Sequence, residues 1–216
     1  PAPGRDALHE FAKIVYDVRV AGAGGRAVAV TRPDPHQSDV SGHGGEVTVT
    51  YTLYADHADG TYTGSDRSHA HLNMPATFLW ARDLDSRAIE LRVHVPEGSG
   101  WRVATQLAPT RDDFVFSAPN LYYFLDSPTE VSDFWMRSWE VDGQTIRVAL
   151  HHTGTEAEAE RYADATGAIV DAARDLYGTL PTFDFGTYTF LACYLPWADG
   201  DGMEHRNSTI LTSTAS

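Results

Sequence analysis

The stretch Glu46-Val47-Thr48-Val49-Thr50-Tyr51-Thr52-Leu53-Tyr54 is the clearest guide to the fold. Polar and apolar residues alternate along it, and most of its side chains are β-branched or aromatic. Both properties are typical of a β-strand. Residues 88–95 alternate in the same way. We therefore expect the first part of the chain to be built mainly from strands.

A hairpin signal lies further along the chain. Residues 134–141 and 145–151 are strand-like, and they flank Asp142-Gly143, a dipeptide that favours tight hairpin turns. Another strand-like run, residues 101–105, follows a Gly-Ser-Gly turn. Strands at this density without helices between them predict a mainly β protein whose N-terminal domain is an antiparallel β-sandwich.

The sequence pattern changes near residue 150. Thr155 and Glu158 have the spacing of a capping box, helical periodicity follows over residues 157–177, and Gly178 is a suitable stop. The apolar stripe of this helix is expected to consist of Tyr162, Thr166, Ile169, Ala173 and Leu176. We also expect a short helix over residues 6–15. The change of pattern predicts one domain over residues 1–150 and a second that begins over residues 151–216.

Composition limits the kinds of partner. The chain has 216 residues, 42% of them hydrophobic, which indicates a folded protein. Its net charge of -14 argues against nucleic acids and anionic membranes as partners. No run is long and apolar enough for a membrane span, so we expect a soluble protein, with the cytoplasm favoured over other compartments. The only cysteine, Cys193, lies in an apolar run and is interpreted as a small core residue.

The segment Gly202-Met203-Glu204-His205 is the strongest candidate for a site. A glycine lets another backbone approach closely, and a carboxylate next to it can bind an amine. An extended segment with both features suits the free N-terminus of a peptide, held by main-chain hydrogen bonds and one charge. The competing interpretation is a surface carboxylate on an edge strand.

Several segments together resemble the glycyl aminopeptidase family, and their order and spacing carry the resemblance. The segments are Pro3-Gly4-Arg5, Gly100-Trp101-Arg102-Val103-Ala104-Thr105, Asp126-Ser127-Pro128-Thr129-Glu130, Tyr188-Thr189-Phe190-Leu191 and Gly202-Met203-Glu204-His205-Arg206-Asn207-Ser208. Members of this family are zinc metallopeptidases with a thermolysin-like α+β catalytic domain and, usually, a PDZ domain. The resemblance implies an N-terminal β domain that lacks its opening strands, followed by the beginning of the catalytic domain.

The resemblance also implies roles for individual residues. Glu204 would bind the α-ammonium group of the substrate, Gly202 and Met203 would offer backbone groups to the peptide, and His205 would line the pocket. The family binds zinc through H-E-x-x-H and a downstream glutamate, and this chain contains no H-E-x-x-H. We therefore expect a longer parent that uses zinc to remove N-terminal residues, glycine most readily, from peptides. The 216-residue chain by itself is expected to be inactive, with no catalytic residue and no metal ligand.

Two alternatives stay open. The chain could be a non-catalytic β-sandwich that binds peptides through an edge strand, and its oligomeric state is not indicated. His69-Ala70-His71 could place two imidazoles on one face of a strand as metal ligands, but the preceding Asp66-Arg67-Ser68 favours a polar loop. His151-His152 is interpreted as a surface pair at the end of a strand.

Overall fold

The computed structural model of the protein describes residues 9–214. The chain divides into two compact units, whose described parts are residues 9–55 and residues 56–214. The Pro3-Gly4-Arg5 segment of the family resemblance lies outside the described residues.

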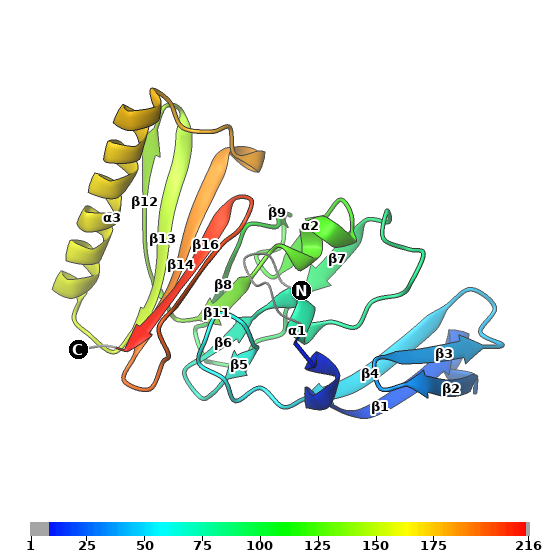
Figure 1. Ribbon diagram of the computed structural model, residues 1–216. Helices are drawn as coiled ribbons and strands as arrows, with labels where there is room; N and C mark the ends of the chain where they lie inside the picture. Colours follow the sequence, from blue (N-terminus) through cyan, green and yellow to red (C-terminus); the bar gives the residue numbers. More distant parts are fainter. Residues whose placement is uncertain (1–8, 215–216) are drawn as a thin grey trace. The chain divides into compact units, whose positions relative to one another are not determined.

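The smaller unit consists of two antiparallel strand pairs. Strand β1 pairs with β4, and β2 pairs with β3 (Figure 1). The elements of this unit are the 3₁₀ helices η1 (Phe11–Ile14) and η2 (Ala23–Gly25) and the strands β1 (Val15–Gly22), β2 (Ala29–Asp34), β3 (Gln37–Ser41) and β4 (Val47–Leu53). The strand expected over residues 46–54 is therefore confirmed as β4.

The helix expected over residues 6–15 is wrong for the residues that the structure describes. Only one 3₁₀ turn forms, over Phe11–Ile14, and β1 begins at Val15. Residues 6–8 lie outside the described residues. The physical reason is the sequence that follows, because Val15, Val18 and Val20 favour a strand and pairing with β4 satisfies its backbone.

The larger unit contains three sheets. Their strand orders are β5-β6-β11-β8, β7-β10-β9 and β12-β13-β14-β16-β15. The strands are β5 (Gly64–Ser65), β6 (His69–Leu72), β7 (Ile89–Arg92), β8 (Arg102–Thr105), β9 (Ala108–Pro109), β10 (Val115–Ala118), β11 (Thr129–Ser132), β12 (Trp135–Val141), β13 (Gln144–His152), β14 (Thr187–Leu195), β15 (Asp201–Glu204) and β16 (Ser208–Thr214). The helices are α1 (Met74–Thr77), α2 (Leu121–Leu125), α3 (Glu156–Tyr177) and the 3₁₀ helix η3 (Asp184–Gly186).

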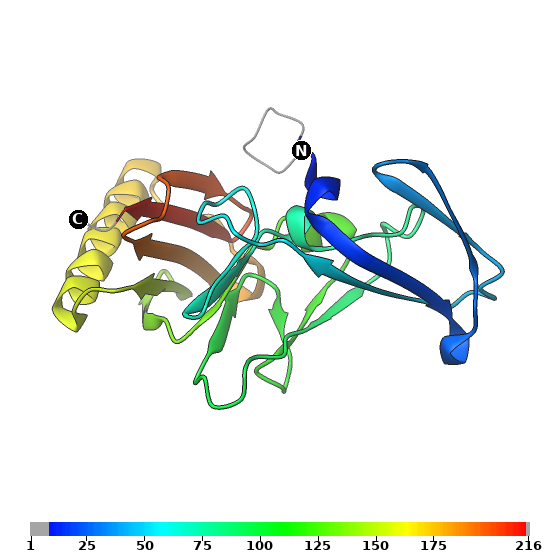
Figure 2. The ribbon, with the colours of Figure 1, turned by 90° about the horizontal axis from the view of Figure 1, so that it is seen from below.

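The five-stranded sheet is covered differently on its two faces. On one face, Ala149 of β13 and Leu191 of β14 form a buried cluster with Ala104 of the four-stranded sheet. On the other face, Ile146 of β13 packs against Val170 of α3. Figure 2 shows α3 lying along this sheet. The alternation of side chains along β13 thus gives one face to the helix and the other to the second sheet.

The mainly β fold with a helix before the last strands is as expected from the sequence. The hairpin turn at Asp142-Gly143 joins β12 to β13, which pair antiparallel over the full length of β12. Helix α3 then returns the chain to β14, which runs parallel to β13. A helical crossover of this kind is the usual connection between neighbouring parallel strands.

The boundary expected near residue 150 falls inside the larger unit. It separates β13 from α3, although β12 and β13 share one sheet with β14, β15 and β16. The compact units instead divide between Ala55 and Asp56. The division into residues 1–150 and 151–216 stays a prediction about the domains of a longer protein.

The apolar stripe expected for α3 is correct in part, because Thr166 is buried and Tyr162 packs against the core, whereas Ile169 and Leu176 are exposed. The buried residues of the helix are Ala159, Ala163, Thr166 and Val170. Ile169 and Leu176 are instead 68% and 77% exposed. Small residues face the sheet because Trp135 and Trp139 already fill the space beneath the helix, where they pack around Ala159.

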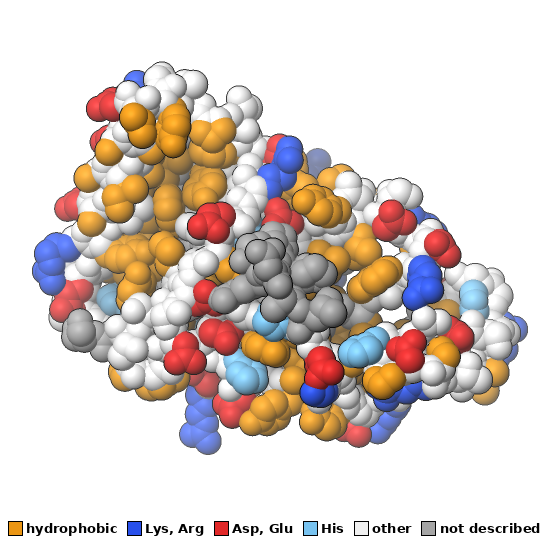
Figure 3. Space-filling view, in the orientation of Figure 1, with side chains coloured by type: hydrophobic (Ala, Val, Ile, Leu, Met, Phe, Trp, Pro, Cys, Tyr) orange, Lys and Arg blue, Asp and Glu red, His pale blue; other side chains and the backbone are white. Residues whose placement is uncertain are grey.

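Hydrophobic side chains gather along α3 and over the sheet beside it (Figure 3). Ile169, Leu176 and Tyr177 contribute exposed apolar surface on the helix.

Within residues 9–214, no helix combines the length and the apolar character that crossing a membrane requires.

Replacing Thr155 by alanine should destabilise the protein by about 1 kcal/mol, as is usual for the loss of an N-cap. The Thr155 side chain accepts a hydrogen bond from the Glu158 N–H, and Glu158 Oε2 accepts one from the Thr155 N–H at 2.7 Å. Urea unfolding of the variant would measure the change. Thr153→Ala, at an exposed position just before the cap, is the matched control. A loss as large in the control would contradict the prediction.

The effect of this substitution should also depend on pH. The hydrogen bonds from Thr155 hold the pKa of Glu158 below its usual value in the folded protein. A carboxyl group whose pKa is lowered by folding contributes stability above its unfolded pKa, and this contribution is lost as the pH falls. Alanine keeps the backbone N–H at position 155 and loses only the hydroxyl that donates to Glu158 Oε2 at 2.8 Å. The hydroxyl's share of the stabilisation is lost in acid, so the difference in the free energy of unfolding between the wild type and Thr155→Ala should narrow as the pH falls.

Candidate functional site

Strand β15 lies at the edge of the five-stranded sheet. Among the strands of residues 9–214 it pairs only with β16, with Met203 opposite Ile210 and Glu204 opposite Thr209. Gly202 and Glu204 are exposed, and Met203 is 1% exposed. The segment singled out in the sequence is thus an edge strand, with one side of its backbone open to another chain.

The pairing pattern determines which backbone groups face outward. The His205 N–H donates to the Ser208 carbonyl at 2.9 Å, so this position of the ladder is hydrogen-bonded. Hydrogen-bonded and non-hydrogen-bonded pairs alternate in antiparallel sheets, which places Met203 among the residues that bond to β16. The N–H and C=O groups of Gly202 and Glu204 therefore face away from the sheet. Consistent with this, the Gly202 N–H donates to the side chain of Asp201 at 2.9 Å.

Side chains of β15 alternate between the two faces of the sheet. Met203 shares its face with Ile210 and Leu191, which is the face toward the four-stranded sheet. Glu204 therefore points to the face that carries α3. On that face, burial and the charge of Glu204 raise the pKa of Tyr188 to about 12. The influence of Glu204 on this phenol indicates that its carboxylate lies near partly buried aromatic surface.

A buried network holds the turn that follows β15. His205 Nδ1 lies 2.9 Å from Asp126 Oδ1, and the Arg206 N–H donates to Asp126 Oδ2 at 3.0 Å. The imidazole of His205 is 1% exposed. The Asp126 turn thus fixes both residues after Glu204 and with them the end of the edge strand.

Gln106 extends this network to the start of β16. Gln106 Oε1 accepts hydrogen bonds from the Asn207 N–H at 2.9 Å and from the Ser208 hydroxyl at 2.8 Å. Its Nε2 donates to the Asp126 carbonyl at 2.6 Å. The segments near residues 106, 126 and 207 thereby form one buried network of hydrogen bonds.

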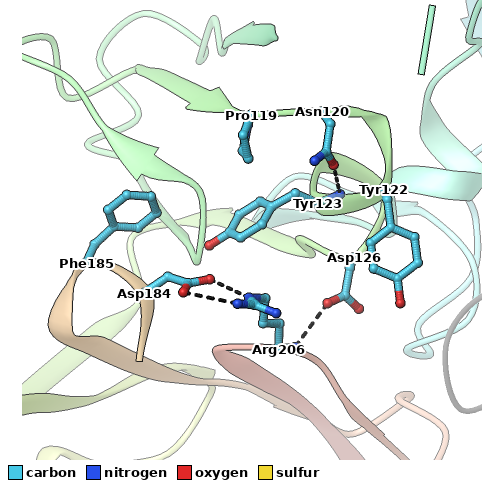
Figure 4. A pocket seen from close by; sticks show the side chains of 8 residues that line it. All are labelled: Pro119, Asn120, Tyr122, Tyr123, Asp126, Asp184, Phe185 and Arg206. Carbon is cyan, nitrogen blue, oxygen red and sulfur yellow. Dashed lines mark hydrogen bonds and ion pairs between the residues drawn. The ribbon is translucent and has the colours of Figure 1, made fainter. Parts of the chain in front are cut away.

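A pocket of about 510 Å³ opens beside the same turn. Figure 4 shows Arg206 paired with Asp184 and the hydroxyl of Tyr123 directed toward this pair. Hydrogen bonds from Arg206 and Asn207 lower the pKa of Asp184, which is therefore ionised at neutral pH. The pocket is lined by Pro119, Asn120, Tyr122, Tyr123, Asp126, Asp184, Phe185 and Arg206.

The expected site residues lie together, but they differ in exposure. Gly202 and Glu204 are accessible on the edge strand, whereas the side chain of Met203 packs in the core and its main chain pairs with β16. The outward backbone groups therefore belong to Gly202 and Glu204 rather than to Gly202 and Met203. His205 is buried and bonded to Asp126 instead of lying open in a pocket. A role of any of them in binding substrate stays a prediction.

Sequence reasoning missed Asp126, Gln106 and Asp184 as parts of this region. In the sequence, Asp126 belongs only to a turn that resembles the family. Asp126 lies 79 positions before His205, and Gln106 lies 101 positions before Asn207. No sequence periodicity relates residues that are so far apart.

Two comparisons with known proteins give matches. The model for the peptidase M61 N-terminal domain matches residues 1–133, and thus ends just before β12. A crystal structure of an aminopeptidase N family protein from Idiomarina loihiensis has the same fold, with a TM-score of 0.84 and 23% sequence identity. The match covers 99% of this chain and 36% of that one. A search of curated proteins gave no match.

The fold and the family match define the class of protein, which is a β-rich chain that contains a peptidase M61 N-terminal domain. The chain belongs to the peptidase M61 family. The resemblance to the glycyl aminopeptidases, stated from the sequence, is thereby confirmed.

Proposed function

We propose that this chain forms the substrate-docking part of a zinc-dependent aminopeptidase that removes N-terminal residues, preferably glycine, from peptides. The observation that carries the proposal is the edge strand β15, whose outward N–H and C=O groups lie at Gly202 and Glu204. A peptide can pair with such an edge as an added strand. The Glu204 carboxylate at the end of the strand would then bind the free amino group of the peptide.

The position of Glu204 supports a charge-based selection of the N-terminus. Its side chain is exposed on the α3 face, and an ionised carboxylate there can accept hydrogen bonds from an ammonium group. Gly202, two residues earlier, carries no side chain on that face of the strand. A substrate chain can therefore approach the backbone closely before it reaches the charge.

The zinc ion of the family does not fit the residues present in this chain. Its ligands come from H-E-x-x-H, and no two histidines here are separated by four positions. No catalytic step is therefore assigned to any residue of this chain. The residues described above bind and orient, and the reaction centre would be supplied by other parts of a longer protein.

The second candidate function is a non-catalytic module that binds peptides through β15. The same open strand edge favours it, because pairing with an edge needs no metal. The two functions differ in their selectivity. An aminopeptidase requires the free amine at the end of the peptide, whereas strand pairing alone accepts internal and blocked segments equally.

The 216-residue chain alone should not hydrolyse a glycyl chromogenic substrate, because the family's metal ligands are absent from it. A longer protein that carries this chain together with H-E-x-x-H should hydrolyse that substrate and should lose activity with a chelator. Parallel assays of both proteins would test the proposal.

Two outcomes would contradict the enzyme proposal. One is chelator-sensitive hydrolysis by the chain alone. The other is a longer protein that contains stoichiometric zinc but does not cleave peptides with a free amino terminus. In that second case, the peptide-binding module would be favoured if the isolated chain bound free and N-acetylated peptides equally.

A further inference from the structure

A buried polar array lies on one face of the four-stranded sheet. Strands β6 and β11 place His71 opposite Glu130 and His69 opposite Ser132. All four residues are buried, and Glu130 is only 1% exposed. The interpretation of His69-Ala70-His71 as a polar loop is therefore wrong, because both imidazoles lie on one face of a strand.

The facing sheet adds two further groups to this array. His151 of β13 and Cys193 of β14 are partners in the parallel ladder, so their side chains share a face. Both are buried, which means that the expected surface pair His151-His152 is wrong for His151. The ring of His151 stacks on that of His69, with 4.5 Å between the ring centroids.

Three possible ligand atoms meet at this point. Cys193 Sγ lies 3.6 Å from His151 Nδ1 and 3.9 Å from His69 Nε2. One donor atom from each of these residues falls within 4.8 Å of the other two. A tetrahedral zinc ion with ordinary Zn–S and Zn–N bonds separates its sulfur and nitrogen ligands by about 3.6 Å. The observed separations are close to that value.

A carboxylate orients one of these imidazoles. Asp66 Oδ1 lies 3.1 Å from His69 Nδ1, on the side of the ring away from Cys193. Asp66 Oδ1 also accepts hydrogen bonds from the Ser68 N–H at 2.7 Å and from the Ser68 hydroxyl at 2.8 Å. When this oxygen accepts the Nδ1 proton of a neutral His69, the Nε2 lone pair is left directed at the cluster. Metal-binding histidines are held in this way by carboxylates.

Further buried polar atoms near the cluster lack protein partners. Within residues 9–214, His71 Nε2, Glu130 Oε1 and the Ser132 hydroxyl make no hydrogen bond to the protein. The charge of Glu130 acts on both Cys193 and His151, so the carboxylate lies near them. Buried groups of this kind normally interact with an ion or an ordered water. They therefore point independently to a bound species.

We propose that His69, His151 and Cys193 bind a Zn²⁺ ion between the two sheets, with Asp66 orienting His69. Imidazole and thiolate ligands in a tetrahedral arrangement favour zinc over magnesium or calcium. The three protein ligands leave the fourth position to a water molecule, for which the unpaired groups of His71, Glu130 and Ser132 are suitable polar partners. The ion would join β6, β13 and β14 and thereby stabilise the packing of the sheets.

The site differs from the zinc site of the family, which needs two histidines on one helix. It also replaces the expectation that the chain holds no metal.

Metal binding by the untagged chain tests this inference. After removal of metals with a chelator, the chain should take up one Zn²⁺ per molecule, and its unfolding midpoint should rise. Addition of Co²⁺ instead should give a thiolate-to-cobalt charge-transfer band in the near ultraviolet. A wild-type chain that binds no zinc, or that binds Co²⁺ without this band, would overturn the proposal without any variant.

Variants locate the ion. Cys193→Ser and His69→Gln should each abolish stoichiometric binding, and Asp66→Asn should weaken it by about 10- to 100-fold. The matched control is His94→Gln, which removes an exposed histidine outside the cluster and should bind zinc like the wild type. Zinc affinity that is unchanged in folded Cys193→Ser would exclude this site. If that variant does not fold, the cobalt spectrum of the wild type decides.

Discussion

Replacing Glu204 by alanine in an active protein that contains this chain should lower kcat/KM for peptides with a free amino terminus by about thirtyfold to a thousandfold. The reason is the loss of an ion pair with hydrogen bonds in a partly buried site, which is worth about 2 to 4 kcal/mol. Glu204 is exposed on the edge strand and lies near Tyr188, so it can reach a ligand while part of its surroundings is protein. Steady-state kinetics would measure the change.

N-acetylated peptides separate amine binding from general damage to the fold. They carry no ammonium group, so the wild type should cleave them poorly and Glu204→Ala should change this little. Glu97→Ala removes another exposed glutamate and serves as the matched control. Free-amine substrates that are unaffected by Glu204→Ala, or an equal loss on both kinds of substrate, would show that the assigned role is wrong.

Replacing Asp126 by alanine should lower the free energy of unfolding of the chain by about 2 to 4 kcal/mol. Asp126 is buried, and its carboxylate accepts a hydrogen bond from the Arg206 N–H and contacts the Nδ1 atom of His205. Without it, the buried imidazole of His205 and the partly buried N–H of Arg206 lose their partner, and each such loss costs about 1 to 3 kcal/mol. Urea unfolding followed by tryptophan fluorescence would measure the change.

Two further variants make this measurement specific. Asp126→Asn keeps an acceptor oxygen and should cost less than alanine. Asp113→Ala, at an exposed position, should change the stability by no more than about 0.5 kcal/mol. If Asp126→Ala were as mild as Asp113→Ala, the network around His205 would not hold the end of β15, and the account of the site would need revision.

Features that depend on neighbours in the chain could be predicted from the sequence. Helix α3 begins at its capping box of Thr155 and Glu158 and ends at Gly178, as expected, because caps act within one turn. Strands β4, β12 and β13 follow from the alternation of side chains and from Asp142-Gly143. The order of several motifs was sufficient to indicate the family. Each of these signals is local or is carried by a known pattern.

Contacts between distant segments were decided only by the tertiary structure. Helix α3 buries Thr166 and Val170 while Ile169 is exposed, and helical periodicity alone cannot identify which of these neighbouring positions will face the sheet. The outward groups of Gly202 and Glu204 depend on the register with β16, which no local signal sets.

The network around Asp126 and the cluster of His69, His151 and Cys193 show most clearly what only the tertiary structure decided. Asp126 and His205 are 79 residues apart, and Cys193 is 124 residues from His69, so no spacing in the sequence relates them. The sequence determined which side chains could bind an amine or a metal, because that follows from their chemistry alone. Only the packing of one sheet on another determined which of them meet, because burial and register act between strands that are remote in the chain.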